Sequence, residues 1–202
     1  MTKQEIFVLN RALDGEPIYG IPDFSGMGIS ELLIDEYKEK MIREGLLADK
    51  ENLTVEGATM VSRMEDYKSS NTFVTLNNLT IGKNINGKMV SLMHNPFYDE
   101  YSFSRIKISE DCSNLLDAYS FLKNIPDSET VFVEKIAYND LVAKYGQMKK
   151  DYLRITRCEN GMESVFTIFT KDNKAYLYDE ESETLSIVGK HEIMEIIREE
   201  LQ

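Results

Sequence analysis

The sequence predicts an α+β protein in which helices flank an antiparallel β-sheet built of two related halves, each a meander followed by a helix. Residues 1–70 carry apolar side chains at helical spacing, whereas from Asn71 short runs of β-branched and aromatic residues alternate with turn signals. The third observation is a repeat. Tyr98-Asp99-Glu100 and Tyr178-Asp179-Glu180 each precede a strand-like and then a helix-like stretch, which predicts a pseudo-two-fold arrangement of the sheet.

The changes of period divide the chain into four parts of one domain that covers residues 1–202. Each predicted half of the sheet ends in an amphipathic helix, and we expect that helix to cover its own half. The parts in order are a helical, winged-helix-like N-terminal part (1–70), a first sheet–helix half (71–126), a β–α connection (127–150) and a second sheet–helix half (151–202).

Capping signals mark the first two helices. Thr2 followed by Glu5 is a capping-box pattern, and Gly15 is a suitable end for the helix that it opens. Ser30 can cap a second helix that ends before Gly45. We expect the buried stripe of this second helix to consist of Leu32, Leu33, Tyr37, Met41 and Ile42.

A winged-helix pattern follows these helices. Leu46-Leu47 and Leu53-Thr54-Val55 flank a polar turn, and a third helix starts at about Thr54. In a winged helix that binds DNA, a basic recognition helix enters the major groove. The helix expected to do so, residues 30–44, carries more acidic than basic side chains. A protein contact is therefore the favoured interpretation, and a regulatory or DNA-binding module is the alternative.

Turn signals and alternation organise the predicted sheet. Asn86-Gly87 and Asn160-Gly161 predict tight hairpin turns. Alternation between residues 101 and 108 changes face midway, which predicts a bulge near Ser104. We expect further elements at residues 109–122 (helix), 130–133 (strand), 139–145 (helix) and 153–158, 164–170, 175–178 and 185–188 (strands), followed by a last helix that carries Ile193, Met194, Ile196, Ile197 and Leu201.

The charge balance limits the classes of partner. The chain has 35 acidic against 23 basic residues and a net charge of −12, which opposes binding to nucleic acid or to an anionic membrane surface. No apolar run approaches the roughly 20 residues of a membrane span. The N-terminus lacks the apolar stretch of a signal peptide, so we expect a cytoplasmic protein without membrane insertion.

No catalytic, cofactor or metal motif stands out. His94, which the sequence places in the loop 93–96, and His191 are the two histidines, and neither has the ligand spacing of a metal site. Cys112 and Cys158 form no CxxC pair and are expected to be reduced thiols. We expect no enzyme and no cofactor, and an enzyme that uses either cysteine is a weaker alternative.

One apolar segment remains without a structural role, residues 83–101. Methionine and aromatic side chains on a loop suit an adaptable protein interface. The apolar loop 18–24 is similar in composition. The alternative for both loops is that they fold back and cover the core. The candidate protein-binding residues are Met89, Leu92, Met93, Phe97 and Tyr98.

The N-terminal layout resembles the EspG-like family of ESX (type VII) secretion-associated proteins. Arg43, Gly45, Leu46 and Leu47 are similar to the RxRGLV segment of that family, and a sheet of two related halves with flanking helices is similar to its fold. The short, acidic form is closest in style to EsaE-like members from low-GC Gram-positive bacteria. As a layout the resemblance covers most of the chain, the specific matching residues lie within the first seventy, and the chain is shorter than mycobacterial members.

The resemblance implies a cytosolic, non-enzymatic chaperone or adaptor. Such a protein binds the apolar helical tip of a secreted substrate, keeps it soluble and delivers it to the secretion machinery, including the membrane ATPase. It implies a helical substrate of the WXG or LXG type and not a mycobacterial PE–PPE pair. The expected state is a monomer or a weak homodimer.

Overall fold

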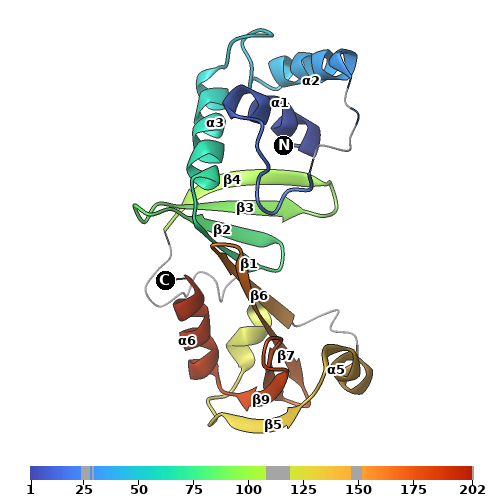
Figure 1. The fold of residues 1–202 in the computed structure, drawn as a ribbon, viewed down its shortest axis with the longest axis vertical. Coiled ribbons are helices and arrows are strands. Elements are labelled where there is room, and N and C mark those ends of the chain that lie inside the picture. Colours follow the sequence, from blue (N-terminus) through green and yellow to red (C-terminus); the bar gives the residue numbers. More distant parts are fainter. Residues whose placement is uncertain (24–27, 29, 108–118, 147–151, 202) are drawn as a thin grey trace. The chain divides into compact units, whose positions relative to one another are not determined.

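The computed structural model describes residues 1–23, 28, 30–107, 119–146 and 152–201. Among these residues, nine strands form an antiparallel sheet in the order β4-β3-β2-β1-β6-β7-β8-β9-β5 (Figure 1). The predicted α+β class with an antiparallel sheet is thus confirmed. Two compact units divide the chain, Met1–Phe73 with Asn78–Ile106 and Val74–Asn77 with Lys107–Gln202, and strand β1 (Thr72–Leu76) contributes residues to both.

The first unit begins with three helices, α1 (Lys3–Leu13), α2 (Glu31–Arg43) and α3 (Val55–Lys68). The predicted capping box of α1 is present, because Thr2 Oγ1 accepts from the Glu5 N–H and Glu5 Oε2 accepts from the Thr2 N–H. Ser30 Oγ accepts the Leu33 N–H and Thr54 Oγ1 accepts the Gly57 N–H, so each caps its helix by a single hydrogen bond. Gly45 follows α2 with a φ of 79°, a left-handed conformation that favours glycine.

The predicted apolar stripe of α2 is partly wrong. Leu32 and Leu33 are exposed, and Ile34 and Met41 are the buried residues of this helix. The stripe that faces the core therefore starts at Ile34. Leu32 and Leu33 lie outside it because each residue advances about 100° around a helix.

Strands β2 (Leu79–Lys83), β3 (Met89–Asn95) and β4 (Glu100–Ile106) form an antiparallel meander in the first unit. The predicted Asn86-Gly87 turn joins β2 to β3, and Gly87 has a φ of 74°. The predicted bulge near Ser104 is wrong, because β3 and β4 pair without a break. Arg105 lies on the same face of β4 as Phe103 and bonds to Asp66 of α3. The alternation seemed to change face because this charged side chain occupies a position on the buried face.

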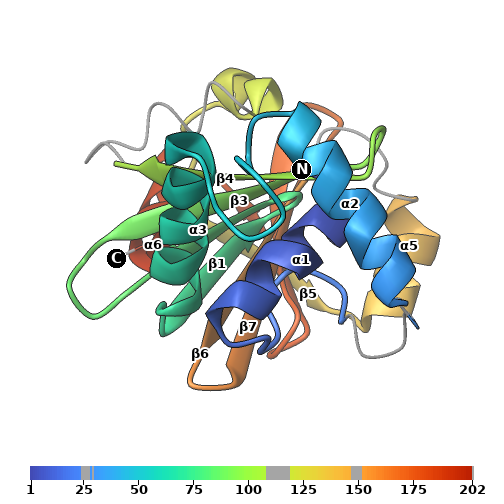
Figure 2. The same cartoon turned by 90° about the horizontal axis from the view of Figure 1, so that it is seen from above.

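The core of the first unit lies between the helices and one face of β3 and β4. Figure 1 shows α1, α2 and α3 above these strands, and Figure 2 shows the three helices side by side in front of them. Tyr67 of α3 is fully buried and packs edge-on against Phe103 of β4 with ring centroids 5.5 Å apart. The buried residues that share this core are Ile6, Val8, Leu9, Ile18, Ile21, Ile34, Met41, Leu46, Leu47, Met64, Tyr67, Val90, Leu92, Tyr101 and Phe103.

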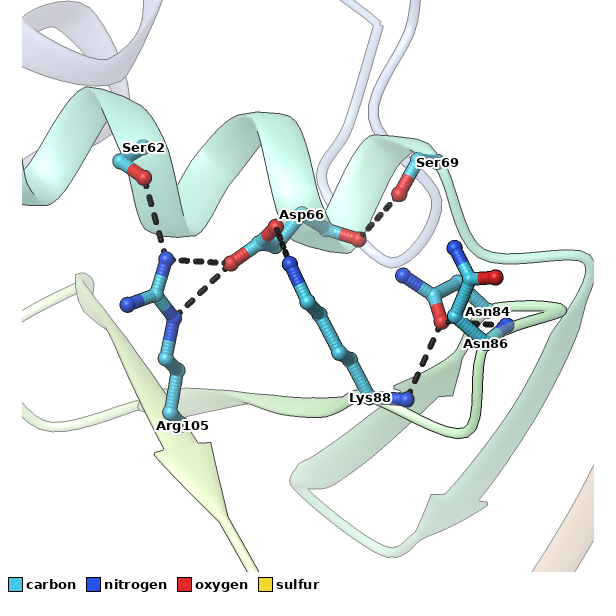
Figure 3. A network of polar contacts seen from close by, with 7 residues as sticks. All are labelled: Ser62, Asp66, Ser69, Asn84, Asn86, Lys88 and Arg105. Carbon is cyan, nitrogen blue, oxygen red and sulfur yellow. Dashed lines mark hydrogen bonds and ion pairs between the residues drawn. The ribbon is translucent and has the colours of Figure 1, made fainter.

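A polar network fixes the exposed side of α3 to the strands (Figure 3). Asp66 accepts hydrogen bonds from Arg105 Nε at 2.8 Å and Nη2 at 2.5 Å, and Lys88 Nζ lies 3.6 Å from its other oxygen. Ser62 Oγ accepts a further bond from Arg105, and Asn84 Oδ1 accepts the Lys88 N–H. The carboxylate of one helical residue thus joins α3 to β4 and to the end of the β2–β3 turn.

The second unit contains a longer meander. Asn160 and Gly161 form the tight turn predicted between its first two strands, and both have positive φ. The fifth strand pairs with the last strand of the meander and shifts register between Phe132 and Glu134. The strands are β6 (Tyr152–Glu159), β7 (Met162–Lys171), β8 (Lys174–Asp179), β9 (Thr184–Val188) and β5 (Val131–Lys135).

Helices α5 (Tyr138–Tyr145) and α6 (Lys190–Leu201) lie on opposite sides of these strands (Figures 1 and 2). The side chain of Leu141 on α5 packs in a core with Phe169, Tyr178 and Leu185. Most of the helix predicted at residues 109–122 lies outside the described residues. Its last part is observed as a 3-10 helix, Ser120–Asn124, in which Leu122 is buried.

Candidate protein-binding site

The five candidate residues do not lie on one surface. Successive side chains of a strand point to opposite faces, so Leu92 and Met93 of β3 separate. Leu92 is 2% exposed and packs in the core of the first unit, which corrects its assignment as a contact residue. Met93 is partly exposed on the other face, and Met89 is half-buried at the start of the strand. Phe97 and Tyr98 lie in the turn between β3 and β4.

This turn, residues 96–99, is here called the aromatic turn. Phe97 is 91% exposed and Tyr98 is 74% exposed, so both side chains project into water. Tight turns are usually made of polar residues and glycine, which leave little apolar surface in contact with solvent. Two adjacent aromatic side chains in this position are therefore available to another molecule.

Polar contacts hold the backbone of the aromatic turn. Asn95 Oδ1 accepts the Phe97 N–H at 3.1 Å, which forms an Asx turn. Asp99 takes a left-handed φ of 49°, which aspartate tolerates better than most residues. One carboxylate oxygen of Asp99 lies 3.1 Å from His94 Nε2, and the other lies 3.8 Å from Lys3 Nζ of α1. The turn is thus tied to both β3 and the first helix.

His94 belongs to β3, which corrects its placement in a loop. Its N–H donates to Asn78 O and its carbonyl accepts from Asn78 Nδ2, each at 3.0 Å. Its ring stacks on the Tyr101 ring with centroids 4.5 Å apart. These contacts extend the strand to Asn95. They give His94 a structural role in supporting the aromatic turn.

The other predicted apolar loop behaves differently. Ile18 and Ile21 are buried in the core of the first unit. Tyr19 stacks on Phe73 at 4.5 Å, and its carbonyl accepts the hydroxyl hydrogen of Tyr67. The described part of this loop therefore folds back and covers the core. Phe24 lies outside the described residues.

A groove that the sequence analysis did not identify lies in the first unit between α1, α2 and the segment 47–53. Its volume is about 390 Å³. Leu47 and Leu53 form an isolated antiparallel bridge that closes one wall. The apolar side chains that line the groove are Val8, Leu9, Ala12, Ile34, Leu47 and Leu53. The sequence offers no local signal for this groove, because its residues come from three separate segments.

The second unit exposes one apolar stretch. Val131, Phe132 and Val133 of β5 are all exposed, and β5 is an edge strand of the sheet. The register shift at Val133 interrupts the regular backbone pattern of this edge. Bulges of this kind are a common way to protect an edge strand from pairing with other chains.

The described residues contain no cluster of metal ligands and one of the two cysteines. Within them, no group of three or more His, Cys, Asp or Glu side chains could hold a metal ion. Cys158 is a free, half-buried thiol, and Cys112 lies outside the described residues. His191 approaches Glu195 of the same helix at 3.7 Å on an exposed surface.

None of the helices in the described part of the chain is long and apolar enough to cross a membrane. No curated protein matches the sequence. A family described as "Domain of unknown function (DUF5081)" matches residues 1–202, that is, the whole sequence. The chain belongs to the DUF5081 family.

Proposed function

We propose that this protein is a cytoplasmic chaperone or adaptor of a type VII (ESX) secretion system. It binds the apolar helical tip of a secreted substrate, keeps that substrate soluble and delivers it to the secretion machinery. The EspG-like layout of the N-terminal residues motivates the role, and the excess of acidic residues suits a carrier that must itself stay soluble. The protein acts without catalysis or cofactor.

The aromatic turn is the observation that carries this proposal. Aromatic side chains contribute much of the energy of protein interfaces, because each buries a large area with few rotatable bonds. Phe97 and Tyr98 are fully available, while Asn95, His94 and Asp99 hold the backbone beneath them. A turn held in one conformation loses less entropy on binding than a mobile loop would.

The partner is a helical substrate of the WXG or LXG type. Its apolar tip packs against Phe97 and Tyr98, and Met93 on the adjoining strand provides an adaptable edge. An interface of standard size covers roughly 800 Å² on each partner. The secretion ATPase is a second, transient partner in this scheme.

The finer architecture belongs to the same proposal. Each unit contains a consecutive antiparallel meander, β2-β3-β4 and β6-β7-β8-β9, which supports a pseudo-two-fold relation between the two halves. The Leu47–Leu53 bridge between α2 and α3 supports the likeness to a winged helix. That likeness keeps a DNA-binding regulator as the second candidate. Mobility-shift titration at several salt concentrations tests it, and we expect no binding.

Co-purification tests the function. The chain is co-expressed with an affinity-tagged helical type VII substrate, and the amount retained is compared among variants. We expect Phe97→Glu and Tyr98→Glu to abolish retention, because each places a charge in the apolar contact. Ile85→Glu is the matched control, since Ile85 is 84% exposed in the β2–β3 turn of the same unit. Retention of the substrate by both aromatic variants would refute the assignment.

A further inference from the structure

The groove between α1 and α2 differs in charge from the rest of the chain. Three of the five charged residues that line it are basic, Arg11, Lys38 and Lys50, although acidic residues predominate in the sequence. The acidic ones are Glu31 and Glu51. A basic side chain beside an apolar groove is a feature that a partner can recognise if no other group of the protein neutralises it.

Contacts within the protein neutralise most of these charges. Arg11 Nη1 lies 3.8 Å from Glu31 Oε1, so one ion pair spans α1 and α2. Lys50 Nζ lies 3.5 Å from Asp35 and 3.2 Å from Glu39, both on α2. Neither pair leaves a charge in need of a partner.

Lys38 remains. Its side chain is half-buried on α2 within the groove, and among the described residues it forms no ion pair. Glu51 is also without an ion pair there, but it is exposed at the rim, where an ion pair adds little to binding. A half-buried ammonium gains more from a carboxylate than an exposed group does, because surrounding protein lowers the local dielectric constant.

The walls of the groove favour a helix as the occupant. Two of its three walls are the helices α1 and α2. The side chains of a helix from another molecule can interdigitate with theirs as ridges into grooves. Val8, Leu9 and Ile34 at the floor of the groove are buried, while Leu53 at its edge is partly exposed. Aliphatic side chains at i and i+4 of an amphipathic helix would enter such a space.

We propose that this groove binds an amphipathic helix of a partner protein, with aliphatic side chains against Val8, Ile34 and Leu53 and with a carboxylate paired to Lys38. The inference does not depend on the secretion role. It defines a second binding surface, built from residues other than those of the aromatic turn.

The test uses two short synthetic helical peptides as probes, labelled with a fluorophore. Both carry leucine at i and i+4, and they differ only in having glutamate or lysine beside the leucines. We expect the glutamate peptide to bind the full-length chain about tenfold more tightly, as one partly desolvated ion pair would require. Lys38→Glu should reverse the preference, and Lys174→Glu on the second unit is the control that leaves it unchanged.

A second variant tests the groove itself. Ala12→Trp fills the space from the exposed side of α1 and should weaken both peptides, with circular dichroism confirming that the fold is retained. Amide chemical shifts locate the bound peptide on the chain. The proposal is overturned if neither peptide binds, if both bind equally, if the shifts map to residues 93–100, or if the free chain self-associates through this groove.

Discussion

The tripeptide Tyr-Asp-Glu occurs once in each compact unit, and its tyrosine has opposite environments in the two. Tyr98 is 74% exposed in the turn between β3 and β4. Tyr178 is 1% exposed within β8, where it packs with Leu141 and Leu185 under α5. In the first unit the three residues are the end of a turn and the first residue of β4, whereas in the second they are the last two residues of β8 and the first residue of the following turn.

The aspartates differ in the same sense. Asp179 closes its own turn, because its carboxylate accepts from the Glu181 N–H at 2.9 Å and from Ser182 Oγ at 2.7 Å. Asp99 instead contacts His94 and Lys3, which belong to other elements. The second turn is self-contained, and its tyrosine stabilises a core. The first turn is anchored from outside and presents its aromatic residues to water, as a binding surface requires.

The largest expected effect contrasts the two tyrosines. Tyr178→Ala should lower the free energy of unfolding by about 3–5 kcal/mol, because it empties a buried aromatic site. Tyr98→Ala should change it by less than about 0.5 kcal/mol, because an exposed side chain makes few contacts. Urea unfolding of both variants measures the difference. Equal effects would show that the two environments have been assigned wrongly.

The next comparison lies within one strand of the first unit. Leu92→Ala should cost about 2–5 kcal/mol, since Leu92 is buried, while its neighbour Met93 faces away from that core. Met93→Ala should cost less than about 1 kcal/mol and should instead weaken substrate retention. Paired unfolding and co-purification measurements distinguish these roles. A large loss of stability for Met93→Ala would place it in the core.

Low pH should change the stability of the two units differently, and in the first unit the residue responsible is Glu5. This residue is buried and pairs with Lys40 Nζ at 2.6 Å. Burial acts to raise the pKa of Glu5, but hydrogen bonds from Lys40 and the Thr2 N–H outweigh it and lower the pKa below 4.5. The carboxylate therefore stabilises the fold at pH values above 4.5, and this contribution is lost as the pH falls through the folded pKa.

Glu5→Gln should cost the first unit about 1–3 kcal/mol at neutral pH, because it removes the charge opposite Lys40. Hydrogen exchange read by mass spectrometry reports each unit separately. The exchange of α1 and α2 should accelerate in the variant, and the acid sensitivity of these helices should decrease. Unchanged exchange in α1 would contradict a stabilising ion pair.

The smallest expected effect concerns Glu200 in the second unit. Burial raises the pKa of Glu200 above 4.5, opposed by Arg157 and assisted by Glu199. Folding thus disfavours the ionised form of Glu200, which lowers the stability of the folded protein. This loss of stability is absent at low pH and appears as the pH rises through 4.5 towards the folded pKa. Glu200→Gln should slightly stabilise α6 at pH 7, detected as slower exchange there. Faster exchange in the variant would show that ionised Glu200 stabilises α6, contrary to this prediction.

Local signals in the sequence were sufficient to predict most elements of the fold. The capping box of Thr2 and Glu5 and the turns at Gly87 and Asn160 depend on residues close in the chain, and all are observed. The errors arose where distant residues decide. Leu92 and Met93 were assigned to the same contact segment, because the sequence does not show where β3 ends. That end is fixed by the hydrogen bond between His94 and Asn78 and by the pairing of β3 with β4.

The candidate site shows the same division. Its exposed part, Phe97 and Tyr98, was identified from aromatic residues beside a turn. The contacts that hold it, from Lys3 and His94 to Asp99, join residues far apart in sequence and could not be inferred. The α1–α2 groove was missed for the same reason, because its walls come from residues 8–12, 31–38 and 47–53.

The central claim is that the aromatic turn is the surface that binds the substrate. Hydrogen exchange of the chain with and without a helical type VII substrate tests it most directly. We expect slower exchange at residues 93–100 in the complex, and no change in the β8–β9 turn that follows Tyr178 and Asp179. Unchanged exchange at residues 93–100, with protection elsewhere in a stable complex, would contradict the claim.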